Sequence, residues 1–311
     1  MRRILILACL IANVSFAARP VIFDTDMGND VDDALALAML HTLTDRGECE
    51  LIGVTLTNAN TAAMPYIRMV NRFYGRPDLP VGTAIKDLKD GDGDGYMATV
   101  LQTMHYARGG AFESAPDLLR RLLKNATEKV VIIQTGFSTN LAALLASPDD
   151  IALVRRKVSL VVAMAGNFTD GAPEYNVRTD VASAKAVFET WPTPILFSGF
   201  EIGRDLPFPA TAIDHDFTYA TPHPIAESYR TYKKMPYDRP TWDLTAALEA
   251  VRPDRGYFGL SGNGAVTVDA KGVTHFTPGV GDRQYLRLDP ARRAEILSVL
   301  ELLSSEPPAR R

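Results

Sequence analysis

The chain has 311 residues, of which 46% are apolar and 23% are charged, the usage of an ordinary globular protein. This composition excludes a disordered chain, a fibrous repeat and a multi-span membrane protein. The 33 basic and 37 acidic residues give a net charge of −4, so the chain lacks the basic surface that nucleic-acid binding requires. Its two cysteines cannot form a disulfide framework.

Residues 1–17 have the three parts of a secretory signal peptide: two early arginines, an apolar run over 4–14, and the small-x-small site Ser15-Phe16-Ala17. The apolar run is too short to span a bilayer as a helix. A buried N-terminal strand, or a lipoprotein lipidated at Cys9, are the competing interpretations. We expect cleavage after Ala17, a secreted or periplasmic mature chain free of the membrane, and a net charge that falls to −6 when the two arginines are removed.

Short apolar runs alternate with helical patterns along the mature chain. Strands are predicted over 20–23, 51–57, 130–134, 158–164 and 194–198, and helices over 31–46, 61–74, 139–146 and 180–190. Strands without polar alternation, separated by helices, are typical of a parallel sheet buried on both faces. In such sheets ligands bind at the carboxyl ends of the strands, so functional residues are expected there.

The C-terminal part has a different pattern. Four short strands with glycine turns are predicted over 257–260, 264–268, 273–276 and 285–288, followed by a helix over 290–303. We therefore expect residues 18–311 to form a single α/β domain, with a mostly parallel central sheet flanked by helices and a small C-terminal β appendage.

An acidic cluster follows the first predicted strand. Residues 24–33 read DTDMGNDVDD, five aspartates in ten positions, and no lysine or arginine occurs between Arg19 and Arg46. A helix cap and a solvated turn account for one or two of these aspartates but not for five. Like charges at this density raise each other's pKa unless a cation lies among them. Carboxylates without histidine or thiolate suit a hard ion, Ca²⁺ or Mg²⁺.

The segment DTDMGNDVDDALAL resembles the signature of the inosine-uridine preferring nucleoside hydrolases. Similar segments follow in family order: GVTLTNANT at 53–61, IIQTGFSTNLA at 132–142, AMAGNF and PEYNVRTDVASA within 163–184, and PTWDLTAAL at 240–248. The resemblance extends over most of the mature chain. It implies a nucleoside hydrolase fold and Ca²⁺-dependent hydrolysis of ribonucleosides to free base and ribose, and it also implies a homo-oligomer, a dimer or a tetramer.

The resemblance implies a role for particular residues. Ca²⁺ would be held by Asp26, Asp33, the backbone carbonyl of Thr135 and Asp243, with Asp26 also the general base that takes a proton from water. The remaining residues would bind the substrate: Asp32, Asn60, Asn167, Glu174 and Asn176 at the sugar hydroxyls, and Met164 at the floor. Two extra residues inside the acidic motif leave Asp30 without a family counterpart, so it is a further candidate ligand.

Trp242 stands where many family members have a histidine that protonates the leaving base. A tryptophan cannot act as a general acid, but it can stack on a ring. We expect Trp242 to bind the base, with Tyr229 or Tyr237 as a second stacking ring. His105, His215 and His223 are the remaining candidate acids. A purine protonated on its ring by solvent can leave without an acidic side chain, so the preferred base stays open.

Two other functions are compatible with parts of the pattern. Asp-x-Asp after a first strand also occurs in haloacid-dehalogenase-like phosphatases, although no later pairing of lysine and aspartate is evident here. A non-catalytic periplasmic ribose- or nucleoside-binding protein is the other alternative, although such a protein would not need so many acids around one sugar. Release of free base from nucleosides separates both alternatives from a hydrolase.

Overall fold

A computed structural model describes residues 18–86, 88, 95–107, 109–110 and 112–309. The predicted signal peptide lies outside the described residues. Within them, none of the helices combines the length and the apolar character needed to cross a bilayer.

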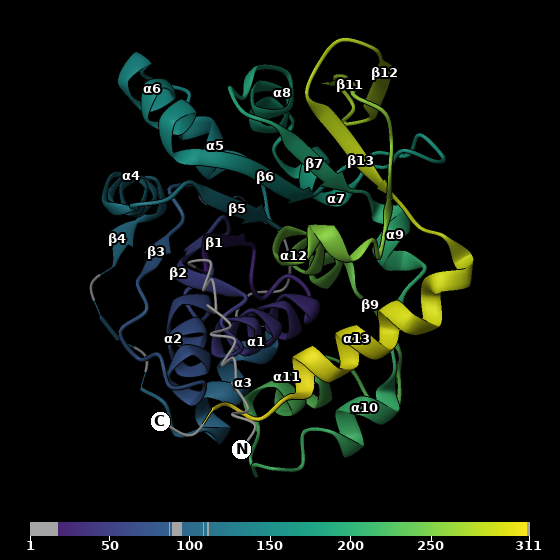
Figure 1. Cartoon of the computed structure of the whole chain (residues 1–311). Coiled ribbons are helices and arrows are strands. Elements are labelled where there is room, and N and C mark those ends of the chain that lie inside the picture. The colour runs from purple at the N-terminus through teal and green to yellow at the C-terminus, as the bar shows by residue number, and fades with distance from the viewer. Residues whose placement is uncertain (1–17, 87, 89–94, 108, 111, 310–311) are drawn as a thin grey trace, which may run out of the picture.

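The strands of the chain build one large sheet with a parallel centre (Figure 1). Its order is β12–β11–β13–β7–β6–β5–β1–β2–β3–β4, with β10 paired to β13. The strands are β1 (Arg19–Thr25), β2 (Cys49–Leu56), β3 (Val81–Thr83), β4 (Glu113–Ser114), β5 (Val130–Gln134), β6 (Val158–Met164), β7 (Ile195–Ser198), β10 (Gly259–Leu260), β11 (Gly264–Val268), β12 (Thr274–Pro278) and β13 (Arg283–Arg287). Two further strands, β8 (Pro207–Phe208) and β9 (Arg239–Pro240), pair antiparallel in a separate ribbon.

Helices cover both faces of the sheet. In Figure 1, α4, α5, α6 and α8 lie above it, and α1, α2 and α12 lie below. The helices are α1 (Asp32–Asp45), α2 (Ala63–Phe73), α3 (Gly95–Thr103), α4 (Ala115–Asn125), α5 (Thr139–Ala143), α6 (Pro148–Lys157), α7 (Tyr175–Thr179), α8 (Val181–Thr190), α9 (Phe200–Arg204), α10 (Ala210–His215), α11 (Pro224–Tyr232), α12 (Trp242–Val251) and α13 (Arg293–Ser305). The architecture confirms the predicted helix-flanked, mostly parallel sheet.

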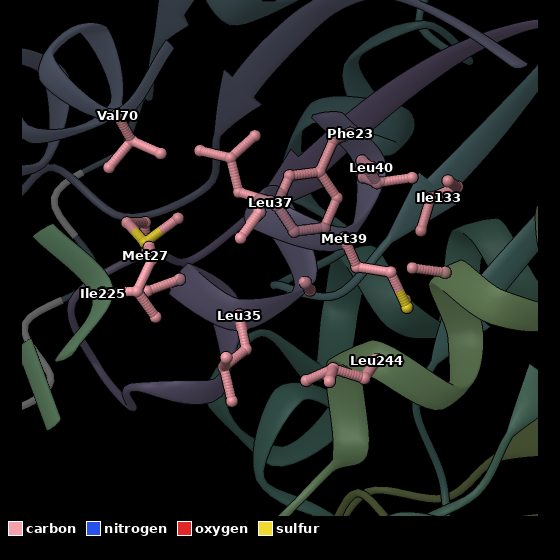
Figure 2. Close-up of a cluster of buried hydrophobic side chains, with 14 of the residues drawn as sticks. Phe23, Met27, Leu35, Leu37, Met39, Leu40, Val70, Ile133, Ile225 and Leu244 are labelled. Atoms are coloured by element: carbon pink, nitrogen blue, oxygen red, sulfur yellow. The ribbon is translucent and has the colours of Figure 1, made fainter. Parts of the chain in front are cut away.

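Side chains of the central strands divide between two hydrophobic cores. On β1, Phe23 belongs to one core and Ile22 to the other, because successive strand residues point to opposite faces. On β5, Ile133 and Ile132 divide in the same way. Figure 2 shows Phe23 and Ile133 in one cluster with side chains of α1, α2, α11 and α12, which together form the first core. Because both faces of these strands are buried, their sequences are continuous apolar runs without polar alternation.

The C-terminal strands are more closely joined to the sheet than an appendage would be. β13 pairs parallel with β7 through Arg283–Ile195 and Tyr285–Phe197, while β11 and β12 form an antiparallel hairpin beyond it. The predicted small antiparallel strands are therefore present, and they extend the edge of the central sheet.

Candidate active site

A pocket of about 290 Å³ opens at the carboxyl ends of the central strands. This volume is at the lower end of the range for small-molecule sites. Four neighbouring strands of the sheet, β1, β5, β6 and β7, each contribute one lining residue at or just after their end. These residues are, in the same order, Asp26, Thr135, Met164 and Phe200. The other lining residues are Asn29, Asp30, Asp32, Asp33, Glu174, Tyr175, Asn176, Tyr232, Arg239, Trp242 and Asp243.

Two glycines allow the backbone that follows β1 to turn into the pocket. Gly28 has a φ of +105°, which side-chain-bearing residues rarely adopt, so the chain can turn between β1 and α1. Gly136 lies so close to β1 that a Cβ there would come within 2.6 Å of the Asp26 backbone nitrogen. Together these positions let Asp26, Asp32 and Asp33 converge, although the last two begin a helix rather than end a strand.

Three aspartates meet at the pocket floor. Carboxylate oxygens of Asp32, Asp33 and Asp243 lie within 4.8 Å of one another, and each residue is at least 96% buried. Asp243 lies in the first turn of α12, and its backbone nitrogen donates to Asp32 Oδ2 at 3.1 Å. The Thr25 hydroxyl donates to Asp33. Residues more than 200 positions apart in the chain thus form one carboxylate group.

Burial dominates the electrostatics of this cluster. Burial raises the pKa of Asp32, Asp33 and Asp243 well above the usual aspartate range, and neighbouring carboxylates raise it further. Burial also raises the pKa of Asp26 to about 7, with a lesser opposing effect from the Asn29 amide. Ionising the whole group therefore requires a compensating positive charge.

The donor set fits a hard divalent cation. All candidate ligands are oxygens, the kind of ligand that Ca²⁺ and Mg²⁺ prefer. Asp243 Oδ2 and Thr135 Oγ1 are buried and have no hydrogen-bond partner within the described chain. Unpaired polar atoms in a buried site are costly unless something satisfies them. A metal ion among these aspartates is consistent with both observations.

A polar wall stands beside the cluster. Asn176 donates its amide to the carbonyls of Thr135 at 2.8 Å and Met164 at 3.0 Å, so it joins the ends of β5 and β6. Glu174 accepts backbone hydrogen bonds from Gly166, Asn176 and Val177. Burial nevertheless raises the pKa of Glu174 to about 7. Both side chains are rigidly held where they can accept or donate to a bound sugar.

Asp30 occupies a different place from the other aspartates. Its carboxylate pairs with Arg239, whose Nε donates to Oδ1 at 2.9 Å, rather than joining the three-aspartate group. The guanidinium neutralises Asp30 and draws it to the pocket wall. This arrangement differs from the ligand role considered for Asp30, and the sequence could not reveal it because Arg239 is 209 residues away.

An aromatic wall faces the carboxylates. The Trp242 ring stacks on Phe200 at 5.5 Å, and its Nε1 donates to the Phe200 carbonyl at 2.9 Å. Tyr232 also lines the pocket, whereas Tyr229 and Tyr237 stack on each other outside the lining. Trp242 thus lines the pocket with Phe200 and Tyr232, whereas Tyr229 and Tyr237, the expected second stacking rings, do not, and the role of Trp242 at the base stays a prediction. Phe200 was detectable in principle, because it follows the end of a buried strand.

The histidines lie away from this site. His223 packs against three aromatic rings, and burial lowers its pKa to about 3. Its Nδ1 accepts from the Ile225 nitrogen and its Nε2 is 2.8 Å from the Tyr219 hydroxyl. His105 and His215 are also absent from the pocket lining. The buried His223 therefore has a structural role as a helix cap.

Two predicted sugar-binding residues do not line the pocket. Asn60 accepts from the Ala62 nitrogen at 2.9 Å, near Gly28, at the end of β2. Asn167 is 3% exposed, and its amide donates to Asp170 at 2.6 Å in the turn after β6. Its backbone nitrogen binds Thr274 of β12. These local hydrogen bonds direct the Asn167 side chain into its own turn.

Residues 21–292 match the family model described as inosine-uridine preferring nucleoside hydrolase, and the chain belongs to this family. A relative in this family is the pyrimidine-specific ribonucleoside hydrolase RihA of Citrobacter koseri, which is 31% identical over 202 residues. That alignment covers 60% of this chain and 61% of the relative, so the chain spans about three fifths of the length of the curated relatives it matches.

Solved structures share the fold at low sequence identity. A plant nucleoside hydrolase, PpNRh1, superposes with a TM-score of 0.73 at 22% identity, covering 93% of this chain and 99% of that one. A purine-preferring ribonucleoside hydrolase from Gardnerella vaginalis gives 0.71 at 21% identity, covering 92% and 99%. These similarities establish the common architecture and carry no information on the substrate of this chain.

Proposed function

We propose that the protein hydrolyses the N-glycosidic bond of ribonucleosides, releasing free base and ribose, with Ca²⁺ as its metal and Asp26 as the general base. The observation that carries this proposal is the buried three-aspartate group, which shares its pocket with a polar wall and an aromatic wall in a member of this family. The two walls match the two halves of a nucleoside.

Asp26, Asp33, Asp243 and the Thr135 carbonyl are the proposed ligands. A bound Ca²⁺ would supply positive charge that offsets the buried carboxylates and makes a nearby water more acidic. Asp26 would accept a proton from water as the general base, and the Asn29 amide, which donates to its Oδ2 at 3.3 Å, orients the carboxylate. The surrounding carboxylates stabilise the positive charge that develops on the sugar as the glycosidic bond breaks.

The polar wall, together with Asp32 of the pocket floor, orients the ribose. Asp32, Glu174 and Asn176 are each at least 94% buried, so their orientation is set before substrate arrives. Hydrogen bonds to ribose hydroxyls then align the anomeric carbon with the attacking water. A deoxyribose would leave one of these buried groups unpaired, and we expect deoxyribonucleosides to be poor substrates for that reason.

A panel of purine and pyrimidine ribosides tests the proposal. Free base released by the purified protein is measured by HPLC, with EDTA, and again after Ca²⁺ or Mg²⁺ is added back. We expect base release that EDTA abolishes and Ca²⁺ restores. Release of phosphate from phosphomonoesters without base release would support the phosphatase alternative. Nucleoside binding without turnover would support a binding protein.

We also propose that the mature protein is secreted or periplasmic and assembles as a dimer or tetramer. The support for secretion is the signal-like pattern of residues 1–17. Mass spectrometry of the exported protein should find an N-terminus at Ala18, and light scattering of the same sample reports the assembly. An uncleaved cytoplasmic product, or a monomer, would contradict the respective part.

A further inference from the structure

Arg239 is the one cationic side chain among the described residues that line the pocket, where six carboxylic acids also lie. It comes from β9, three residues before Trp242. Its guanidinium lies 5.2 Å from the Trp242 ring and 5.4 Å from the Tyr232 ring. Phe200, Trp242, Arg239 and Tyr232 therefore form one continuous stacked wall, on the side proposed to receive the base.

The hydrogen bonds of Arg239 fix the plane of its guanidinium and use only two of its three nitrogens. Nε and Nη2 pair with Asp30, and Nη2 is also 3.3 Å from the Tyr232 hydroxyl. Nη1 makes no hydrogen bond to any part of the chain that the structure describes. A guanidinium held on two sides loses little further freedom when it binds a ligand. Nη1 is thus the free donor of a side chain that lines the pocket and whose orientation is already fixed.

The reaction creates a need for such a donor. When the glycosidic bond breaks, both electrons pass to the base, which becomes negatively charged unless it is protonated. Trp242 cannot supply a proton there, and His223 is buried elsewhere. An arginine keeps its own proton at every relevant pH, but it can hydrogen-bond an anion strongly.

Building on the proposed function, we infer that Arg239 Nη1 hydrogen-bonds the departing base and stabilises the negative charge that forms on it. Water oxygen bonds to the anomeric carbon as the carbon–nitrogen bond breaks, and Asp26 takes the proton of that water. The released base takes a proton from solvent, and Asp26 returns one to solvent. Arg239 stays charged throughout, and Asp30 holds it in register with Trp242.

The test compares leaving groups in R239Q, which keeps a planar polar group on a shorter side chain and removes the charge. The substrates are uridine, inosine and p-nitrophenyl β-ribofuranoside, whose nitrophenolate is a stable anion that needs no stabilising donor. We expect kcat/KM to fall about 10²-fold for the two nucleosides and by less than about 3-fold for the nitrophenyl riboside. R239K keeps the charge without the planar fork, and should show a smaller loss for the nucleosides.

Arg230 provides a matched control, because it pairs with Glu227 and Asp214 outside the pocket. R230A should leave all three rates unchanged, and thermal melts should show that every variant is folded. An equal loss of activity on all three substrates in R239Q would mean that Arg239 only supports the pocket, and would overturn the inference.

Two other results would also overturn it. If the wild type prefers nucleoside 5′-monophosphates and R239Q loses that preference, Arg239 binds a phosphate instead. If the wild type cleaves none of the three ribosides, the proposed function itself fails. Cleavage of all three by the wild type, with a uniform loss in R239Q, leaves the proposed function standing and removes only the role of Arg239.

Discussion

Asp26 combines burial with a position at the end of β1 beside the three-aspartate group. If it is the general base, D26N keeps its size and its contact with Asn29 while removing its capacity to take a proton. We expect kcat for ribonucleosides to fall by about 10²- to 10⁴-fold. Single-turnover measurements should show the same loss. Base release at the wild-type rate would exclude this mechanism.

Trp242 can report base binding directly, because the chain has only two tryptophans. The other, Trp191, is 2% exposed and donates to Thr193 away from the pocket. In W191F, we expect saturable quenching of the remaining Trp242 fluorescence by free nucleobases. Removing the ring in W242A should weaken base binding about tenfold, the size of one aromatic pair. Calorimetry measures this loss, and W191F alone should bind as the wild type does.

Helix α1 is buried on nearly all sides, and its Leu37 is fully buried in the core shown in Figure 2. L37A should lower the free energy of unfolding by about 2–5 kcal/mol, since a cavity remains where neighbours cannot collapse. Urea denaturation measures the change. L302A on α13 is the control: this leucine is 57% exposed, and its truncation should cost less than about 0.5 kcal/mol. Equal costs would contradict the packing described for α1.

The N-terminus of α11 should make the protein sensitive to acid. His223 caps this helix through Nδ1, and burial lowers its pKa to about 3. In the unfolded chain the histidine pKa is about 6.5, so the unfolded state binds a proton at His223 more readily than the folded state does. The free energy of unfolding therefore falls as the pH drops from about 6.5 towards 3.

The asparagine variant H223N, which can cap without titrating, isolates this effect. The loss of unfolding free energy between pH 7 and pH 5 should be smaller in H223N, by at most about 1.4 kcal/mol per pH unit. Urea titrations at the two pH values provide the measurement. Identical slopes for both proteins would show that His223 does not titrate with unfolding. The acidic limb of the rate profile should be the same in both proteins, because His223 lies outside the pocket.

Metal binding should be coupled to the stability of the folded chain. The carboxylates at the floor come from the first and twelfth helices, so an ion that binds both would join segments distant in the chain. We expect a stabilisation of about 2.7 kcal/mol when free Ca²⁺ is 100 times its dissociation constant. Calorimetric melts with Ca²⁺ and with EDTA measure it. D243N, which removes one carboxylate, should melt at the same temperature in both conditions.

Much of the fold was predictable from the amino-acid sequence alone. Continuous apolar runs at 130–134 and 158–164 identified buried strands with the correct bounds, because burial on both faces leaves no polar alternation. The acidic motif and the family resemblance predicted Asp26, Asp33 and Asp243 as metal ligands and Asp32 as a sugar-binding residue, whereas the structure groups Asp32 with Asp33 and Asp243. Local signals of this kind suffice where the chemistry is concentrated in a short segment.

The pairing of side chains that are distant in the sequence became visible in the folded structure. Asp30 carries the same local signal as its neighbours, yet Arg239 neutralises it from 209 residues away, and Asn167 turns into its own loop. Phe200 and Tyr232 join Trp242 through strand order and helix placement, which no local pattern encodes. Pairing between remote charges and rings depends on how the elements pack, and packing is a property of the folded chain as a whole.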